Sequence, residues 1–230
     1  GETVPKLHIL CDNQIPVSRG LGSSAAAVIG GLLGANSLIG DMLSNERLLQ
    51  IASEIEGHSD NVVPAMRGGC QIVLRDEDQI ITSHVSVADG LKVVLFVPNV
   101  EMSTSDAREV LPQHYERPDV VFNMGRVAML VNALSTGDFT NLRTATQDRL
   151  HQPYRLSLFP QMSRILDAAI LAGALGSFLS GAGSSVVALA SDGEKLIGEA
   201  MWKSAMEAGI SGTTMICSLW LPGAEVLLGG

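Results

Sequence analysis

A glycine-rich turn followed by two hydroxyl side chains is the segment of this chain best suited to chemistry. Residues 16–27 read Pro-Val-Ser-Arg-Gly-Leu-Gly-Ser-Ser-Ala-Ala-Ala, so the turn leads directly into an apolar run. Glycine lacks a Cβ and lets backbone N–H groups approach an anion, and the start of a helix carries about half a positive charge. The segment therefore predicts a phosphate-binding loop, in which Ser23 and Ser24 cap the helix or reach a metal ion.

Two familiar nucleotide-binding motifs compete for this loop. The P-loop requires a lysine directly after its last glycine, and no lysine follows Gly22. The dinucleotide-binding pattern Gly-x-Gly-x-x-Ala is matched by Gly20, Gly22 and Ala25. Its context is missing, because Pro16 lies just before the turn and the acid about 20 residues on, Asp41, ends no second strand. A dinucleotide-binding enzyme is thus the weaker alternative.

Several segments resemble the GHMP kinases, small-molecule kinases that act on galactose, homoserine, mevalonate and phosphomevalonate. Residues 16–26 match Pro-x-x-x-Gly-Leu-Gly-Ser-Ser-Ala-Ala without a break. Residues 60–65 resemble Asp-Asn-Val-Ala-Pro-Ala, with valine for the first alanine, and residues 179–185 resemble the C-terminal glycine motif of the superfamily. Residues 103–112 and 152–155 look like homoserine kinases rather than their relatives.

The resemblance implies an α+β fold with the two-layer GHMP kinase architecture. Residues 1–88 would form the N-terminal, ATP-binding domain and residues 89–230 a ferredoxin-like C-terminal domain, with the ligand between them. Family members begin with a Ser-Ala-Asn-Leu-Gly-Pro-Gly-Phe-Asp-like segment that residues 1–4 do not contain. The resemblance therefore implies an incomplete first layer with exposed strand edges and apolar surface.

Apolar spacing predicts the elements that would hold these motifs. Residues 24–38 are apolar on nearly every face and are expected to form a central, buried helix. Further helices are expected at 45–56, 122–134, 139–150, 162–171 and 194–208, and strands at 6–11, 69–74, 91–97, 174–179, 185–190 and 213–219. The order of elements after residue 90 suits a ferredoxin-like sheet with an enlarged first crossover.

The resemblance also implies roles in ATP and Mg²⁺ binding. The magnesium ligands would be Ser24 and a glutamate on the following helix, for which Glu54 is preferred to Glu56. Hard oxygen ligands of this kind suit Mg²⁺. The ATP-binding loop would comprise Pro16, Val17, Ser18, Arg19, Gly20, Leu21, Gly22, Ser23, Ser24, Ala25 and Ala26.

The phosphate acceptor would be L-homoserine, bound by a second set of residues. Asn61 would hydrogen-bond the substrate and cannot act as a base, and Thr104 would contact the acceptor or the γ-phosphate. Arg108 and Arg155 would clamp the carboxylate, since guanidinium groups bind carboxylates through two parallel hydrogen bonds. The expected catalytic residues are Asn61, Thr104 and Arg155. His58 is expected to be a loop histidine rather than a catalyst.

Composition restricts the partners. The net charge of −9 has no offsetting lysine and arginine cluster, which argues against nucleic acid. No stretch approaches the ~18 apolar residues of a membrane span. The three cysteines are far apart and form no metal-ligand spacing, which suits a reducing compartment. We therefore expect a cytoplasmic protein without a membrane partner, with a homodimer as the candidate assembly.

These features lead to one predicted activity and, besides the dinucleotide-binding enzyme, two further alternatives. The predicted reaction is ATP-dependent phosphorylation of the L-homoserine hydroxyl to O-phospho-L-homoserine, a step of threonine biosynthesis in the family that the chain resembles. One alternative is a nucleotide-binding fragment with impaired catalysis. The other is a GHMP kinase for another small alcohol such as mevalonate.

Overall fold

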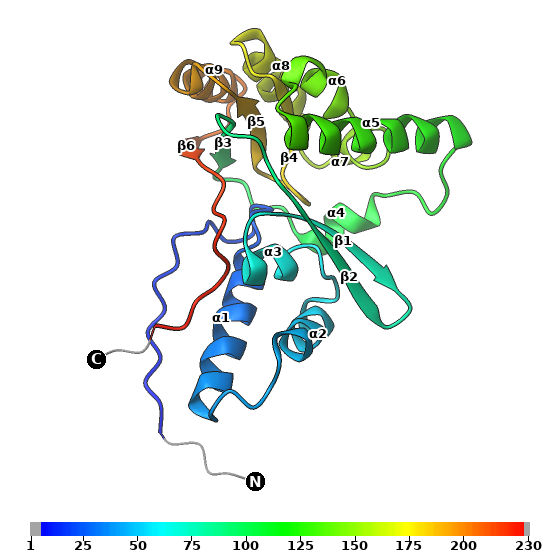
Figure 1. Cartoon of the computed structure of the whole chain (residues 1–230). Coiled ribbons are helices and arrows are strands. Elements are labelled where there is room, and N and C mark those ends of the chain that lie inside the picture. The colour runs from blue at the N-terminus through cyan, green and yellow to red at the C-terminus, as the bar shows by residue number, and fades with distance from the viewer. Residues whose placement is uncertain (1–5, 228–230) are drawn as a thin grey trace.

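A mainly helical layer lies below a layer built on a sheet in the computed structural model, which describes residues 6–227 apart from the side chain of Thr104 (Figure 1). The helical layer also carries a long antiparallel hairpin. Its elements are α1 (Ser23–Leu38), α2 (Asn45–Glu56), α3 (Val62–Arg67), β1 (Cys70–Asp76) and β2 (Gln79–Val85).

Helix α2 has the bounds that the sequence predicts, because both of its ends carry strong signals. The Ser44 side chain accepts a hydrogen bond from the backbone N–H of Arg47, and Gly57 ends the helix at φ 74°. Helices α1, α2 and α3 then share one small core, made of Ala25, Ile29, Leu48, Leu49, Ala52, Val62, Val63 and Met66.

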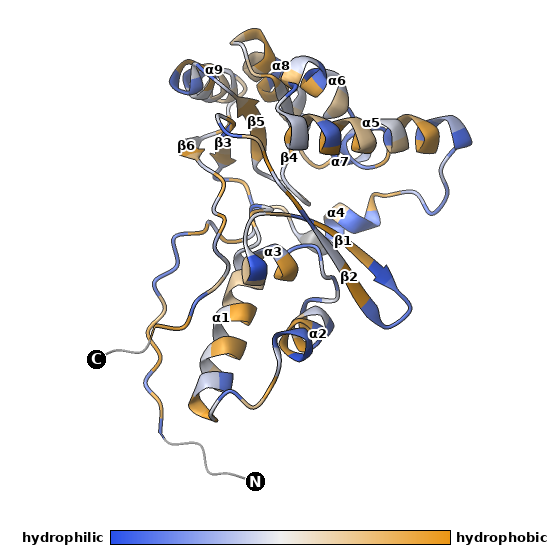
Figure 2. Ribbon diagram, viewed as in Figure 1, coloured by the Kyte–Doolittle hydropathy of each residue, from blue (hydrophilic) through white to orange (hydrophobic). Residues whose placement is uncertain are grey.

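The expectation that α1 is buried on all sides is wrong. Helices α2 and α3 pack on one side of it, and no described segment covers the opposite side. A Cβ added at Gly30, Gly31 or Gly34 would meet nothing within 4 Å, and Leu38 is 56% exposed. Figure 2 shows the apolar turns of this helix. A pattern that is apolar all round therefore leaves hydrophobic surface in contact with solvent here.

The expected strand at residues 6–11 does not form either. A strand needs a neighbour to pair its N–H and C=O groups, and no described segment pairs with these residues. Leu10, near the end of this stretch, is 88% exposed.

The upper layer has the expected ferredoxin-like sheet. Its antiparallel strands follow the order β4-β5-β3-β6, with α8 and α9 against one face. The described strand pairs are all antiparallel, so the doubly wound parallel sheet of the dinucleotide-binding alternative is excluded. The elements are β3 (Lys92–Pro98), α8 (Met162–Leu171), β4 (Gly176–Leu179), β5 (Val186–Ala190), α9 (Glu194–Glu207) and β6 (Gly212–Cys217).

Strand β3 is central because its two faces contribute to different cores. Val94 and Phe96 pack with α8 and α9, whereas Leu95 and Val97 pack on the opposite face. The crossover from β3 to β4 is long and reaches back toward the helical layer (Figure 1). Before it reaches α8, it contains α4 (Thr104–Glu109), α5 (Arg117–Thr136), η1 (Phe139–Asn141), α6 (Leu142–Ala145) and α7 (Gln152–Arg155).

The predicted helix at residues 139–150 is wrong beyond its first two turns. Helix α6 ends at Ala145, and the chain then turns around Asp148. The Asp148 carboxylate accepts hydrogen bonds from the backbone N–H groups of Leu150, His151 and Gln152. Aspartate side chains that bond nearby N–H groups compete with a continuous helix in this way.

The C-terminal segment joins the two layers again. It runs from the sheet back past α3 (Figure 1), where Gly69 donates a backbone hydrogen bond to the carbonyl of Trp220 and Ala224 donates one to that of Met66. Across residues 6–227, none of the helices combines the length and the apolar character needed to cross a bilayer. The predicted division at residues 88 and 89 stays a prediction.

Candidate active site

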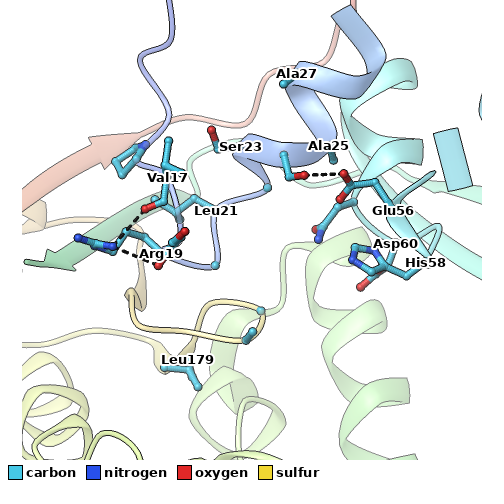
Figure 3. Close-up of a pocket in the computed structure, with 18 of the residues that line it drawn as sticks. Val17, Arg19, Leu21, Ser23, Ala25, Ala27, Glu56, His58, Asp60 and Leu179 are labelled. Atoms are coloured by element: carbon cyan, nitrogen blue, oxygen red, sulfur yellow. Dashed lines mark hydrogen bonds and ion pairs between the residues drawn. The ribbon is translucent and has the colours of Figure 1, made fainter. Parts of the chain in front are cut away.

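A cleft of about 780 Å³ lies between the two layers (Figure 3). It is lined by residues that are far apart in the sequence but belong to only a few segments. These are Asn13, the loop and helix start at residues 16–25 with Ala27, the segment from Glu56 to Asn61, Arg108 on α4, His151 and Arg155 around α7, and Leu179, Gly181 and Ala182 at and after the end of β4.

The first wall is the predicted phosphate loop. Gly20 and Gly22 have φ values of 73° and 75°, a conformation that glycine adopts without strain. A Cβ at Gly20 would lie 2.2 Å from the carbonyl oxygen of Ser180, so no other residue fits there. The Ser180 hydroxyl donates to the Gly20 carbonyl at 2.8 Å, and the backbone N–H of Ser185 donates to the Arg19 carbonyl at 3.1 Å. The two glycine loops therefore hold each other in place.

The start of α1 offers unpaired donors to the cleft. The first backbone hydrogen bond of the helix runs from Ala26 N to the Gly22 carbonyl at 3.0 Å. The preceding N–H groups of Ser23, Ser24 and Ala25 have no acceptor among the described residues. Together with the helix dipole they form a site for an anion such as a phosphate.

The expected capping role of the two serines is not seen. The structure records no side-chain cap on α1. The Ser23 hydroxyl instead accepts a hydrogen bond from the Asn13 amide at 3.0 Å, and the Ser24 hydroxyl donates to a carboxylate oxygen of Glu56 at 2.5 Å. The Ser24 hydroxyl and the Glu56 carboxylate thus place two oxygen donors side by side at the start of α1.

Glu56, and not the expected Glu54, lies beside Ser24 at the start of α1. Residues two positions apart on a helix differ by about 200° in direction. The side chains of the two glutamates therefore point to nearly opposite sides of α2. Glu54 is exposed and does not line the cleft, whereas Glu56 does and faces the start of α1 (Figure 3). A hydroxyl and a carboxylate fit the oxygen preference of Mg²⁺. The described residues contain no group of three His, Cys, Asp or Glu side chains for a metal ion.

The segment before α3 supplies the next wall. Asn61 precedes the helix and lines the cleft, with its amide oxygen 3.9 Å from the position of a Cβ on Gly22. His58 and Asp60 line the cleft as well, and His58 Nδ1 lies 2.8 Å from a carboxylate oxygen of Asp60. Neither His58 nor Asp60 is among the site residues expected from the sequence. Their position beside Asn61 in the same motif was the available signal.

Both predicted arginines reach the cleft, but Arg155 is more constrained than expected. Its side chain is buried, with 9% of the residue exposed. Nε donates to the Ala107 carbonyl at 3.1 Å, and Nη1 donates to the Gly181 carbonyl at 2.8 Å and lies 3.0 Å from His151 Nδ1. A side-on fork through Nε is therefore not available, and the two N–H groups of Nη2 are the ones without a described partner.

Arg108 differs from Arg155 in being exposed and without a hydrogen bond to a described residue. Neither guanidinium forms an ion pair with a carboxylate of the described chain. Burial lowers the pKa of Arg155, and the nearby charge of Arg108 lowers it further, although Asp148 and Tyr115 act in the opposite direction. Two cations without an ion-pair partner among the described residues thus line one cleft. The side chain of Thr104, expected nearby, lies outside the described part of the structure.

Arg19 does not contribute its charge to the cleft in the way that a phosphate ligand would. Its Nε donates to the carbonyl of Pro98 at the end of β3, at 2.8 Å, and Nη1 lies 3.6 Å from a carboxylate oxygen of Glu101. The side chain therefore ties the phosphate loop to the sheet layer.

Comparison with known proteins gives one consistent family. The model described as "GHMP kinases N terminal domain" matches residues 1–69, and the one described as "GHMP kinases C terminal" matches residues 130–208. The homoserine kinase of Caldicellulosiruptor saccharolyticus is 45% identical over 183 residues, covering 80% of this chain and 59% of the relative. That of Synechococcus sp. is 40% identical over 227 residues, covering 98% and 74%.

A solved structure agrees with this result. The crystal structure of homoserine kinase from Cytophaga hutchinsonii is similar with a TM-score of 0.84 at 30% sequence identity, over 92% of this chain and 69% of that one. The chain spans about three fifths of the length of the first two curated relatives that it matches, 59% and 60%.

Proposed function

The chain belongs to the GHMP kinase family, with homoserine kinases as relatives over nearly its whole length, and from this premise we propose that it phosphorylates L-homoserine with ATP. The product would be O-phospho-L-homoserine, an intermediate of threonine biosynthesis. The hydroxyl oxygen of homoserine forms a bond to the γ-phosphorus, the bond to the ADP oxygen breaks, and one proton is released.

The observation that carries the proposal is the distribution of positive charge in one cleft. The unpaired N–H groups at the start of α1 suit phosphate, and the unpaired guanidinium N–H groups of Arg108 and Arg155 suit a carboxylate. A substrate with a carboxylate at one end and a hydroxyl a few bonds away fits between these two charges.

Nucleotide and metal would bind on the α1 side. The backbone N–H groups of Ser23, Ser24 and Ala25 would hold phosphate oxygens, and the Ser24 hydroxyl and the Glu56 carboxylate would hold Mg²⁺. When bound, Mg²⁺ neutralises the charge that develops on the transferred phosphoryl group. The two protein oxygens leave further positions for nucleotide oxygens and water.

The acceptor would bind on the α7 side. The Asn61 amide would hydrogen-bond the substrate next to the phosphate loop, since it lies beside Gly22. Arg155 would contact the carboxylate through Nη2 alone, and the exposed Arg108 would supply a second donor. Orientation of the acceptor and stabilisation of charge then lower the barrier without a strong base.

A nucleotide-dependent assay with several acceptors tests the proposal. ADP release by the purified chain is measured with L-homoserine, mevalonate, galactose and shikimate, and the phosphorylated product is identified by mass spectrometry. We expect turnover with L-homoserine only. Turnover of mevalonate without homoserine would reject the substrate assignment. Binding of ATP and Mg²⁺ in calorimetry without any phosphohomoserine would favour the catalytically impaired fragment.

A further inference from the structure

Asp148 is a buried carboxylate outside the cleft that the proposed reaction does not use. Its side chain is 7% exposed, and no lysine or arginine of the described chain pairs with it. Four N–H groups bond to it instead: Oδ1 accepts from the Asn123 amide at 2.6 Å and Leu150 N at 3.1 Å, and Oδ2 accepts from His151 N at 2.8 Å and Gln152 N at 2.6 Å. Burial would raise the pKa of Asp148, but these hydrogen bonds outweigh it and lower the pKa below its usual value.

These bonds fix the start of α7. A helix leaves its first N–H groups without partners, and a single turn of helix is not stable alone in water. Asp148 satisfies the donors of His151 and Gln152 at this end, and Asn123 ties the carboxylate to α5. The Gln152 side chain then accepts a hydrogen bond from the backbone N–H of Leu179 at 2.8 Å, which joins α7 to the end of β4.

The same arrangement orients the imidazole of His151. His151 and Arg155 are four residues apart and share one face of α7, where Nδ1 lies 3.0 Å from Arg155 Nη1. Because an arginine can only donate, Nδ1 must be the unprotonated acceptor of this contact. The proton of the neutral ring is then on Nε2, which lies 3.7 Å from Asp148 Oδ1. The Asp148 carboxylate thus favours the tautomer whose Nδ1 accepts a hydrogen bond from Arg155.

Arg155 has few remaining ways to move. Of its five N–H groups, one on Nε and two on Nη1 point to Ala107, Gly181 and His151. Without the contact to His151, the guanidinium would keep two carbonyl partners and would lose one of its three restraints. With it, both N–H groups of Nη1 are held and Nη2 is left for the cleft.

We propose that Asp148 and His151 are positioning residues for Arg155: the buried carboxylate sets the start of α7 and the ring orientation of His151, and His151 Nδ1 holds Nη1 so that Nη2 faces the substrate carboxylate. This inference rests on the proposed function. It goes beyond that function by assigning two residues that act through Arg155 rather than on the substrate.

Substitutions at His151 separate positioning from folding. The amide oxygen of His151→Asn can occupy nearly the place of Nδ1 and accept from Arg155, whereas His151→Leu fills the space without an acceptor. We expect His151→Leu to raise the KM for L-homoserine about tenfold or more. A change of this size corresponds to the loss of one hydrogen bond to a charged group. His151→Asn should stay within about threefold of the parent chain, and the KM for ATP should change in neither variant.

Asp148→Asn tests the other member of the pair. It is nearly isosteric but introduces an N–H where the native oxygen accepts, so it should raise the homoserine KM about tenfold or more with a smaller change in kcat. Asp138→Asn is the matched control, because Asp138 also accepts a backbone N–H, from Thr140, and does not line the cleft. Equal KM values for Asp148→Asn and Asp138→Asn would overturn the proposal.

Nitrogen NMR of the imidazole gives a readout that needs no turnover. With ¹⁵N-labelled chain, the His151 signals are identified as those lost in His151→Asn. We expect a neutral ring with the proton on Nε2, and a loss of that preference in Asp148→Asn. A ring with its proton on Nδ1 in the parent chain would overturn the proposal. If the parent chain shows the expected tautomer but neither binds nor phosphorylates L-homoserine, the proposed function fails instead.

Discussion

The hydroxyl of Ser180 donates a hydrogen bond to the carbonyl oxygen of Gly20 at 2.8 Å, across 160 residues of sequence. This contact joins the phosphate loop of the helical layer to the glycine loop of the sheet layer, at a place where the backbones are too close for any side chain on Gly20. The two halves of the cleft are therefore positioned by direct backbone packing.

Gly20→Ala should separate the two loops. The new Cβ would lie 2.2 Å from the Ser180 carbonyl, and the backbone φ of 73° also disfavours alanine. We expect a lower melting temperature and a weaker ATP affinity, measured by thermal unfolding and calorimetry. Gly31→Ala is the control, because it lies on the exposed side of α1 with nothing within 4 Å of the new Cβ. That change should stabilise the chain by about 0.5–1 kcal/mol.

Glu56→Gln should weaken the binding of Mg²⁺, and Glu54→Gln should not. Glu56 bonds to the Ser24 hydroxyl in the cleft, whereas Glu54 is exposed on the other side of α2. The measurement is the Mg²⁺ concentration for half-maximal turnover at saturating ATP. We expect an increase of about tenfold for Glu56→Gln. The reverse order of effects would return the metal assignment to Glu54.

The loop at the start of the cleft could be predicted from residue types because its signals are local, whereas Asn61, Arg108 and Arg155 were expected from the resemblance to the GHMP kinases. The loop at residues 16–26 needs only glycines, hydroxyls and a following helix, and these are visible in the sequence. The order of apolar runs after residue 90 likewise predicted the ferredoxin-like sheet. The helix after the loop and the strands of this sheet form as expected, because the local preferences of these segments agree with the fold.

The differences between the sequence-based expectations and the structure have tertiary causes. Glu54 and Glu56 differ only in which side of α2 they occupy, and that depends on how α2 packs against α1. The exposed side of α1 depends on which segments cover it. The partners of Arg155 could not be predicted, because two of them are the carbonyl groups of Ala107 and Gly181, which no residue type reveals.

The two arginines should respond differently to substitution. Arg108→Leu should raise the homoserine KM about tenfold or more and leave stability unchanged, since its guanidinium has no described partner. Arg155→Leu should raise the KM by a similar factor and also lower the melting temperature, because it leaves the carbonyls of Ala107 and Gly181 without donors. An unchanged KM in Arg155→Leu with a lower melting temperature would make Arg155 purely structural and leave Arg108 as the carboxylate ligand.

The stability of the chain should decrease in mild acid because of His151. Burial lowers the pKa of His151 below its ordinary value of 6.5, Arg155 lowers it further, and Asp148 opposes both only in part. The folded state thus favours the neutral ring. Its contribution to stability is complete above 6.5, declines as the pH falls below that value, and is lost once the pH has passed the lowered pKa of the folded state.

Asp148 also has a lowered pKa, so its contribution is lost only as the pH falls below its ordinary value of 3.8. Measurements between about pH 7.5 and about pH 4.5 therefore isolate the histidine of this pair. The test is the free energy of unfolding in urea, compared between the parent chain and His151→Asn, which cannot titrate. The other four histidines are common to both proteins. We expect the parent chain to lose stability relative to the variant as the pH falls. A difference that is constant across this range would mean that His151 is not held neutral against Arg155.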